Sequence, residues 1–238
     1  MRLLKEEFVY QVSFMPNWFP VNCYLLEEDE SLTLIDAALP NSTKSIIEAA
    51  KKIGKPIKRI VLTHAHFDHV GALDSIKKLL PAVEVMISAR DARLLAGDSS
   101  LDPSEPSTPV RGGVPKNIYT VPTTLLEDGD MIGSLKVIAS PGHTPGSISF
   151  YDTRSGILIA GDAFQTRGGM AVSGKVKPLF PFPAMATWNK EIAVNSAKKL
   201  ALIEPTLLAV GHGNMMKSPL QSMKKAISEA EKTMKVSS

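Results

Sequence analysis

The stretch Thr63-His-Ala-His-Phe-Asp-His-Val-Gly71 places three histidines and one aspartate within six positions. The 238-residue chain has only five histidines, so most of them lie in this one stretch. A predicted strand at residues 57–62 precedes it, since short runs rich in Val, Ile and Leu predict β-strands. Four side chains that can bind metals or move protons therefore follow a strand directly, where loops commonly carry function.

The two remaining histidines and a further aspartate repeat this arrangement elsewhere in the chain. Predicted strands at 135–139, 157–160 and 207–210 lead to Pro141-Gly-His143, Gly161-Asp162 and Gly211-His212-Gly213. Every histidine thus lies just beyond the carboxyl end of a predicted strand. Scattered core or surface histidines would not share one position in this way, so the pattern predicts a common site.

The spacing within the first stretch suits two metal ions. Side chains two residues apart in an extended segment point to the same side, so His64 and His66 can bind one ion together. Asp68 and His69 follow a turn, where a helix is predicted to begin, and approach from a direction that suits a second ion. Neutral imidazole nitrogens and carboxylate oxygens both suit zinc, and no cysteine is needed.

Short strands and helices alternate along the rest of the chain. Further strands are predicted at 8–14, 23–27, 32–35, 83–87 and 147–151, and helices at 42–53, 70–80, 91–96 and 188–203. Thr187 is the predicted N-cap of the helix at 188–203, and Ser218 caps a last helix whose first position is Pro219. The pattern predicts a layered α/β protein. No shift in composition marks a boundary, so we expect a single domain over residues 1–238.

Composition and charge exclude several classes of function. The net charge is only +3 and the lysines are scattered, so no basic stripe for nucleic acid is present. No run of about 18 apolar residues could span a membrane. The first residues lack the apolar core of a signal peptide, and the single cysteine, Cys23, cannot form an internal disulfide. We therefore expect a cytoplasmic protein with a small-molecule substrate, and no oligomeric state is indicated.

The order His64-x-His66-x-Asp68-His69, followed by His143, Asp162 and His212, resembles the metallo-β-lactamase superfamily. The likeness covers nearly the whole chain and extends to Val21-Asn22 and Leu34-Ile35-Asp36 in two early strands. It implies an α/β fold, a four-layer αβ/βα sandwich. In this sandwich two mixed β-sheets pack face to face, helices cover the outer faces, and the metals lie at one edge.

The resemblance also implies a role for each residue of the pattern. His64, His66 and His143 would hold one metal ion, Asp68, His69 and His212 would hold the other, and Asp162 would bridge them. Asp36 would orient the loop of ligands from outside the first coordination shell. Two zinc ions held in this way can share a hydroxide that attacks a carbonyl or phosphoryl centre. Asp68 is the candidate that carries a proton to the leaving atom.

Departures from known relatives narrow the substrate. Zinc β-lactamases with two metals usually have a cysteine where this chain has Asp162, and acyl-homoserine lactonases have a tyrosine where this chain has Gln165. Glyoxalase II relatives add a helical domain, whereas only 26 residues follow His212 here. The lead prediction is therefore a binuclear zinc hydrolase that cleaves an ester, lactone or thioester.

Two segments without a clear pattern, 102–122 and 166–186, are either lids over the site or surface loops. The second of these contains several apolar side chains, and Trp18 and Phe19 lie in an earlier loop that overhangs the site in relatives. The residues expected to form an apolar wall for substrate, or otherwise to contact it, are Trp18, Phe19, Gln165, Phe180 and Phe182. The alternative is that the aromatic residues complete the core.

Two other functions fit the same residues. A persulfide dioxygenase would hold a single Fe²⁺ on His64, His143 and Asp162, the two-histidine, one-carboxylate set that leaves positions open for oxygen. A regulatory member of the fold without catalysis is less compatible with a complete ligand set.

Overall fold

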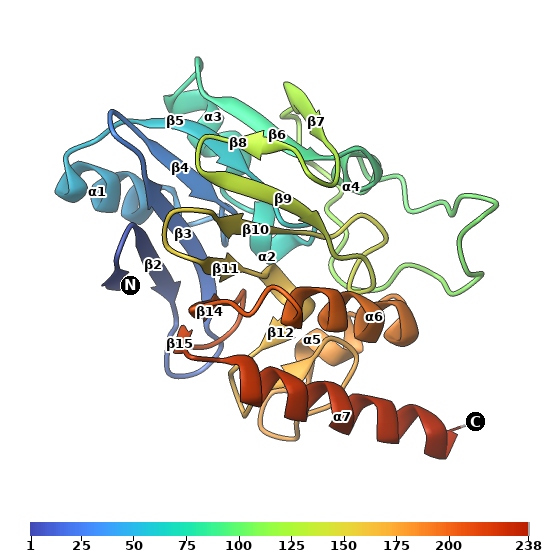
Figure 1. Cartoon of the computed structure of the whole chain (residues 1–238). Coiled ribbons are helices and arrows are strands. Elements are labelled where there is room, and N and C mark those ends of the chain that lie inside the picture. Colours follow the sequence, from blue (N-terminus) through green and yellow to red (C-terminus); the bar gives the residue numbers. More distant parts are fainter. Residues whose placement is uncertain (238) are drawn as a thin grey trace.

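Two β-sheets lie face to face at the centre of the computed structural model, which describes residues 1–237 (Figure 1). The first sheet has the strand order β1-β2-β3-β4-β5-β6-β7 and the second has the order β15-β14-β11-β10-β9-β8. Both are mixed, since β4, β5, β6 and β7 run parallel to one another and β11 runs parallel to β14, while the other pairs are antiparallel.

The first sheet is built from the first half of the chain and the second sheet from the second half. The strands of the first sheet are β1 (Arg2–Glu6), β2 (Val9–Phe14), β3 (Val21–Glu27), β4 (Leu32–Ile35), β5 (Ile57–Val61), β6 (Glu84–Ser88) and β7 (Thr124–Leu126). Those of the second sheet are β8 (Met131–Ile132), β9 (Leu135–Ala139), β10 (Ile148–Asp152), β11 (Ile157–Ile159), β14 (Leu207–Ala209) and β15 (Met216–Lys217). A separate hairpin joins β12 (Phe164–Gln165) to β13 (Ala171–Val172).

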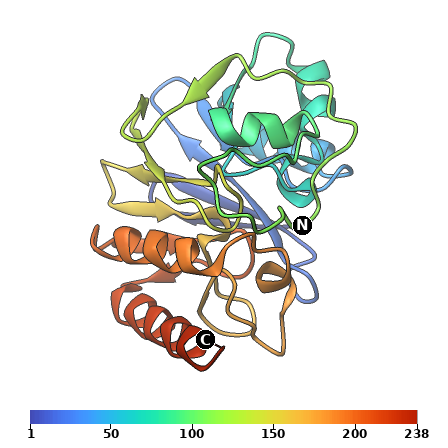
Figure 2. The ribbon, with the colours of Figure 1, turned by 90° about the vertical axis from the view of Figure 1, so that its right-hand side faces the viewer.

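Helices cover the outer faces of both sheets. The first sheet carries α1 (Thr43–Ile53), α3 (Leu73–Leu79) and α4 (Ala89–Leu95), while α6 (Lys190–Ala201) and α7 (Leu220–Ser237) lie side by side against the second (Figure 2). The remaining helical elements are short: α2 (Phe67–Val70), α5 (Phe182–Met185) and the 3₁₀ turn η1 (Gly161–Ala163).

Three clusters of buried apolar side chains fill the three spaces between the four layers. Strand β3 shows how one sequence serves two of them: Cys23 and Leu25 pack toward the first sheet's helices, while Tyr24 and Leu26 pack between the sheets. Side chains alternate between the faces of a strand, so a strand buried on both faces is apolar at most of its positions. The third cluster joins the second sheet to α6 and α7. The predicted four-layer sandwich is confirmed.

The predicted elements agree closely with the observed ones, with three corrections. The helix predicted at 70–80 is interrupted, because α2 ends at Val70 and α3 begins at Leu73. Gly71 packs on Pro40 so closely that a Cβ there would lie 2.6 Å from the proline ring. Thr187 is not an N-cap: Asn189 caps α6, and its side-chain oxygen accepts a hydrogen bond from the Ile192 amide. The last helix, α7, starts at Leu220, so Pro219 is not its first residue and Ser218 is not the residue that directly precedes it.

The two segments without a clear pattern differ in the structure. Between α4 and β7 the chain forms neither helix nor strand, whereas 166–186 contains β13 and α5. The long loop from 97 to 123 extends away from the sheets and then returns to the site, where the amide of Phe67 donates to the Gly113 carbonyl (Figure 1). Within the described residues, no helix is both long enough and apolar enough to cross a membrane.

Candidate metal centre

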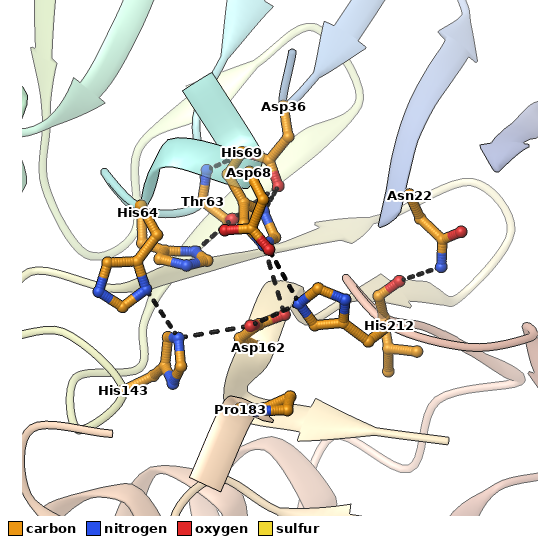
Figure 3. A network of polar contacts seen from close by, with 12 residues as sticks. Asn22, Asp36, Thr63, His64, Asp68, His69, His143, Asp162, Pro183 and His212 are labelled. Atoms are coloured by element: carbon orange, nitrogen blue, oxygen red, sulfur yellow. Dashed lines mark hydrogen bonds and ion pairs between the residues drawn. The ribbon is translucent and has the colours of Figure 1, made fainter. Parts of the chain in front are cut away.

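Seven side chains from four separate segments meet at one edge of the sandwich (Figure 3). His64 and His66 follow β5, Asp68 and His69 belong to α2, His143 follows β9, Asp162 lies in η1, and His212 follows β14. All five histidines and Asp162 are buried, and the Asp68 side chain is 20% exposed. The structure therefore brings together every residue that the sequence pattern predicted for the site.

Each histidine has one ring nitrogen that is held from outside the cluster. The Nδ1 of His212 donates to the Pro20 carbonyl at 2.7 Å, and the Nδ1 of His69 donates to Asp36 Oδ2 at 2.8 Å. Because a neutral imidazole has one N–H, these bonds leave the Nε2 lone pair of both rings facing the cluster. The tautomer follows from the hydrogen-bond partners.

His64 is held through a relay that starts at Asp36. This carboxylate accepts from the Thr63 amide and from the Thr63 hydroxyl, each at 2.8 Å. Because the Thr63 hydroxyl proton points at Asp36, its oxygen is left to accept from His64 Nδ1 at 3.0 Å. The Nε2 of His64 is buried and has no partner among the described residues. Asp36 therefore orients two histidines, which is the supporting position that the resemblance implies for it.

A second relay holds His143. The Thr187 hydroxyl donates to the Pro183 carbonyl at 2.7 Å, so its oxygen accepts from Ser173, 2.8 Å away. Ser173 Oγ is then left to accept from His143 Nδ1 at 2.8 Å. The Nε2 of His143 consequently presents a lone pair to the cluster. Sequence reasoning missed this chain of hydroxyls, since Ser173 and Thr187 lie far from His143 in sequence and carry no motif.

In His66 the two ring nitrogens exchange roles: Nε2 is held from outside the cluster and Nδ1 faces it. Its Nε2 donates to the Arg111 carbonyl at 2.9 Å, which leaves the Nδ1 lone pair facing His143 Nε2 at 3.0 Å. With the tautomers fixed in this way, neither nitrogen has a proton to share, so two lone pairs oppose each other across this distance. Such an arrangement is unfavourable unless a cation lies between the two atoms. This pair is the clearest sign that the cluster fits a metal ion.

The separations between the inward-facing atoms also fit. Asp162 lies 3.2 Å from His212 Nε2, 3.3 Å from His143 Nε2 and 3.5 Å from His69 Nε2. Ligands at the usual zinc distances of about 2.0–2.1 Å in a tetrahedron lie about 3.3 Å apart. The groups of side chains that could hold a metal ion include His64, His66 and His143 as one set and Asp68, His69 and His212 as another. Asp162 faces both sets (Figure 3).

Burial and charge set the protonation of the cluster. Burial, with repulsion from neighbouring imidazoles, holds the pKa of His64 well below its usual value, and burial likewise lowers the pKa of His143. Burial also acts on His69 and His212, but the Asp162 carboxylate overcomes it and raises the pKa of both. Burial would raise the pKa of Asp162, yet His212 and His69 keep it well below its usual value. The aspartate is therefore ionised and can act as an anionic ligand.

Gly211 leaves room for the centre of the cluster. A Cβ at this position would overlap Asp162 Oδ1 and would lie 2.7 Å from His69 Cε1. The Asn22 amide donates to the Gly211 carbonyl at 2.9 Å, and the Asn22 side chain donates to the Gly213 carbonyl at 2.7 Å. The early strand that carries Asn22 thereby fixes the loop on either side of His212.

Asp91 is a further important residue that sequence reasoning missed. It is fully buried, and it accepts from the Ala65 amide at 2.9 Å, the Thr144 hydroxyl at 2.7 Å and the Gly146 amide at 2.8 Å. Ala65 lies between two of the clustered histidines, and Thr144 follows a third. One carboxylate in α4 thus ties together loops that are far apart in sequence. Burial raises the pKa of Asp91 to about 6.

A cavity of about 200 Å³ opens onto the cluster. Phe19 and Phe182 line it as predicted, and their rings lie 4.9 Å apart. Three other predicted substrate residues do not line it. Phe180 is buried behind Phe19, the Gln165 side chain donates to the carbonyls of Arg167 and Phe180, and Trp18 is 86% exposed. The lining residues that were not predicted are Leu39, Phe67, Gly113, Pro183 and Ala186.

Comparison with known proteins agrees with this geometry. A sequence model of the metallo-beta-lactamase superfamily matches residues 16–212, which include the whole cluster. The chain belongs to the metallo-β-lactamase superfamily. The sequence-based recognition of the family is thereby confirmed.

Relatives of this superfamily resemble the chain over most of its length. It is 58% identical to the uncharacterized protein YobT of Bacillus subtilis, over 98% of this chain and 100% of the relative. It is 36% identical to the probable metallo-hydrolase YflN of the same organism, over 81% and 80%. The hydroxyacylglutathione hydrolase GloC of Haemophilus influenzae is 26% identical over 82% and 87%.

A solved structure titled as the di-iron-bound form of TTHA1623 is similar too. It is 27% identical, with a TM-score of 0.65, and the match covers 89% of this chain and 96% of that one. Family membership and the metallo-hydrolase relatives support the prediction of a metal-dependent hydrolase.

Proposed function

We propose that this metallo-β-lactamase superfamily member is a binuclear zinc hydrolase that cleaves an ester, lactone or thioester bond of a small molecule. One observation carries the proposal. All five histidines are anchored at one nitrogen from outside the cluster, and their other nitrogens face one another and the carboxylates of Asp162 and Asp68. This is the arrangement in which supporting hydrogen bonds orient metal ligands.

The proposed ligands divide into two sets, with Asp162 shared. One set is His64, His66 and His143, and the other is Asp68, His69 and His212. Two zinc ions bound here would supply a nucleophile from water at neutral pH and would polarise the scissile carbonyl. The chain's own residues set the conditions for this chemistry: the relays through Asp36 and Ser173 fix the ligand rings, and burial keeps bulk water from competing.

Asp68 is placed to move a proton. It is the only partly exposed carboxylate of the seven clustered side chains, it lines the cavity, and its Oδ2 lies 3.4 Å from His212 Nε2. A carboxylate at the border between the cluster and the cavity can accept a proton from the attacking water and donate it to the leaving oxygen or sulfur. We assign Asp68 this role in addition to metal binding.

The lining of the cavity favours an uncharged, apolar substrate group. Every charged or titratable side chain in the lining belongs to the cluster itself, namely His66, Asp68, His143, Asp162 and His212. The remaining walls are Phe19, Leu39, Phe67, Gly113, Phe182, Pro183 and Ala186. Since none of these side chains can pair with a charge, an alkyl or ring-bearing acyl group fits better than a charged one.

The test compares two p-nitrophenyl esters on the zinc-loaded protein. We expect a higher kcat/KM for the hexanoate than for the acetate, because the longer acyl chain buries apolar area against Phe182. Phe182→Ala should remove most of that preference, while Trp18→Ala, a matched change outside the cavity, should keep it. Hydrolysis of neither ester, nor of any lactone or thioester in a broad panel, would contradict the hydrolase itself.

A second function retains support from one observation. The similar TTHA1623 structure is titled as di-iron-bound, so one protein that resembles this chain binds iron. A single Fe²⁺ on His64, His143 and Asp162 would suit a persulfide dioxygenase. Oxygen consumption with glutathione persulfide by the iron-loaded protein, faster than any hydrolysis by the zinc-loaded protein, would favour this alternative.

A further inference from the structure

Two arginines face a pocket and have no acidic partner among the residues that the structure describes. Arg59, Arg90, Arg93 and Arg154 all form ion pairs with aspartate or glutamate. Among the side chains that the structure describes, no carboxylate lies within ion-pair distance of Arg2 or Arg167. Both guanidinium groups instead line one pocket of about 460 Å³ that contains no aspartate or glutamate.

The remaining contacts of these arginines are with neutral oxygens. Arg2 donates one hydrogen bond to the Asn214 side chain at 2.6 Å, and Arg167 donates one to the Asn17 carbonyl. The Nε of Arg2 is buried and has no partner among the described residues. A guanidinium group carries five N–H donors, so donors on the terminal nitrogens of both groups remain free to bind a ligand, whereas the buried Arg2 Nε is not open to it.

The pocket lies beside the metal centre without being part of it. Its lining shares no residue with the cavity over the cluster. The loop at 15–20 separates the two, since Asn17 lines the pocket, Phe19 lines the cavity, and the Pro20 carbonyl holds His212.

On the other side, the backbone connects the pocket to the same histidine. The amides of Thr166 and Arg167 donate to the His212 carbonyl at 3.0 and 3.2 Å, and Gly213 is the next residue. A ligand held by Arg167 would therefore act on the loop that positions His212.

We propose that the pocket lined by Arg2 and Arg167 is a binding site for a small oxyanion, a carboxylate or phosphate group. Two guanidinium groups present planar pairs of donors that match such oxygens, and the side chains of Asn17, Asn214 and Thr166 add neutral polar groups to the lining. Pro16, Met215 and Met216 complete the walls, and apolar walls strengthen charge interactions by excluding water. This site is distinct from the proposed hydrolytic centre and does not depend on its activity.

The test is a sulfate titration of the zinc-loaded protein, observed through the arginine Nε–Hε signals in ¹⁵N NMR. Sulfate has the shape and charge of a phosphate group but binds zinc weakly, so the metal centre interferes little. We expect two of the seven arginine signals to shift together and to saturate with one dissociation constant. Arg2→Gln and Arg167→Gln should each remove one of these two signals, which assigns them.

The same variants measure the contribution of each arginine. Each glutamine change should weaken sulfate binding by at least about tenfold, since loss of one charge-assisted hydrogen bond is worth about that factor. Arg167→Lys should weaken it less, because the charge remains and only the planar donor pair is lost. Lys217→Gln is the matched control: it removes one positive charge next to the lining residue Met216 but outside the pocket.

Signals of Arg2 and Arg167 that do not saturate would overturn the proposal. An equal loss of sulfate affinity in Lys217→Gln would also overturn it, because net charge alone would then explain the weaker binding. Kinetics then identify the source of the anion. If an ester with a terminal carboxylate has a lower KM than the neutral ester, and Arg167→Gln removes this difference, the site binds the far end of the substrate. A sulfate-dependent change in hydrolysis of the neutral ester assigns it to a free anion. Both results require the saturable site.

Discussion

At the scale of single residues, the site depends on which ring nitrogen of each of the five histidines carries the N–H. The positions of these histidines could be predicted from the sequence, because a metal cluster needs nitrogen and oxygen ligands at the ends of strands. Their supports could not. Thr63, Ser173 and Thr187 are hydroxyl residues in otherwise ordinary surroundings, and only the folded chain shows that their hydrogen bonds end on His64 and His143. The side chain of Gln165, a predicted substrate residue, donates to the backbone carbonyls of Arg167 and Phe180.

Removing one hydroxyl from the second relay should weaken metal binding without abolishing it. In Ser173→Ala the His143 Nδ1–H loses its main acceptor, and changes of this kind lower metal affinity by about 10–100-fold. Competition with a chromogenic zinc chelator measures the effect. Thr33→Val is the matched control, because the Thr33 hydroxyl is buried with no partner among the described residues. Equal affinity in Ser173→Ala and wild type would show that this relay does not orient His143.

Metal affinity should fall as the pH is lowered. Asp162 raises the pKa of His69 and His212 in the metal-free protein, so both gain protons readily and must release them before they can bind zinc. The stability of the metal-free fold depends on pH in the opposite direction. The raised pKa values stabilise the fold at low pH, and that contribution is lost as the pH rises through them. Zinc dissociation constants at pH 6 and pH 8 in buffered zinc test the first statement, and a tighter constant at pH 6 would contradict it.

At the scale of elements, the central strands of each sheet were easier to predict than the strands at the sheet edges. All nine predicted strands correspond to observed ones, because each has two buried faces or one clear alternation. Strands β1, β7, β8, β12, β13 and β15 were missed. Four of them are edge strands (β1, β7, β8 and β15), β12 and β13 form the separate two-stranded sheet, and edges lack the dense apolar pattern of a core strand. The predicted helix at 70–80 was wrong at its start, because the turn that aims His69 ends α2 before α3 begins.

Asp91 gives α4 a role beyond packing. Asparagine in its place would retain one acceptor but would turn an amide N–H₂ toward backbone donors, so at least one buried donor would lose its partner. A buried unsatisfied donor costs about 1–3 kcal/mol, so the free energy of unfolding of Asp91→Asn should fall by about that amount. Urea unfolding measures the loss, and zinc affinity should fall with it. The exposed change Asp29→Asn serves as the control; no difference between the two variants would remove Asp91 from this role.

At the scale of the whole molecule, the three apolar clusters and the metal centre are separate structures. The residues that fill the four-layer core contain none of the seven clustered side chains. This separation explains why the fold class could be predicted from alternating patterns, whereas the cavity walls could not. Leu39, Phe67 and Pro183 lie in three segments that only the packing of both sheets brings to one cavity.

The separation predicts that hydrolysis and folding can be lost independently. His66→Ala should reduce ester hydrolysis to background while its far-UV circular dichroism stays like that of the wild type, because His66 contributes nothing to the three apolar clusters. An unfolded variant would show that the histidine cluster is part of the structural core. Wild-type turnover by a folded variant would remove His66 from the mechanism.

The central claim is that Asp162 is shared by two metal ions. The most direct test is metal content per chain, measured by plasma mass spectrometry on protein purified without chelator or added metal, for wild type and Asp162→Ala. The account predicts about two zinc ions per wild-type chain. In the variant it predicts loss of metal from both positions, since the carboxylate faces both sets of histidines. One iron per wild-type chain, or a variant that still holds two zinc ions tightly, would contradict it.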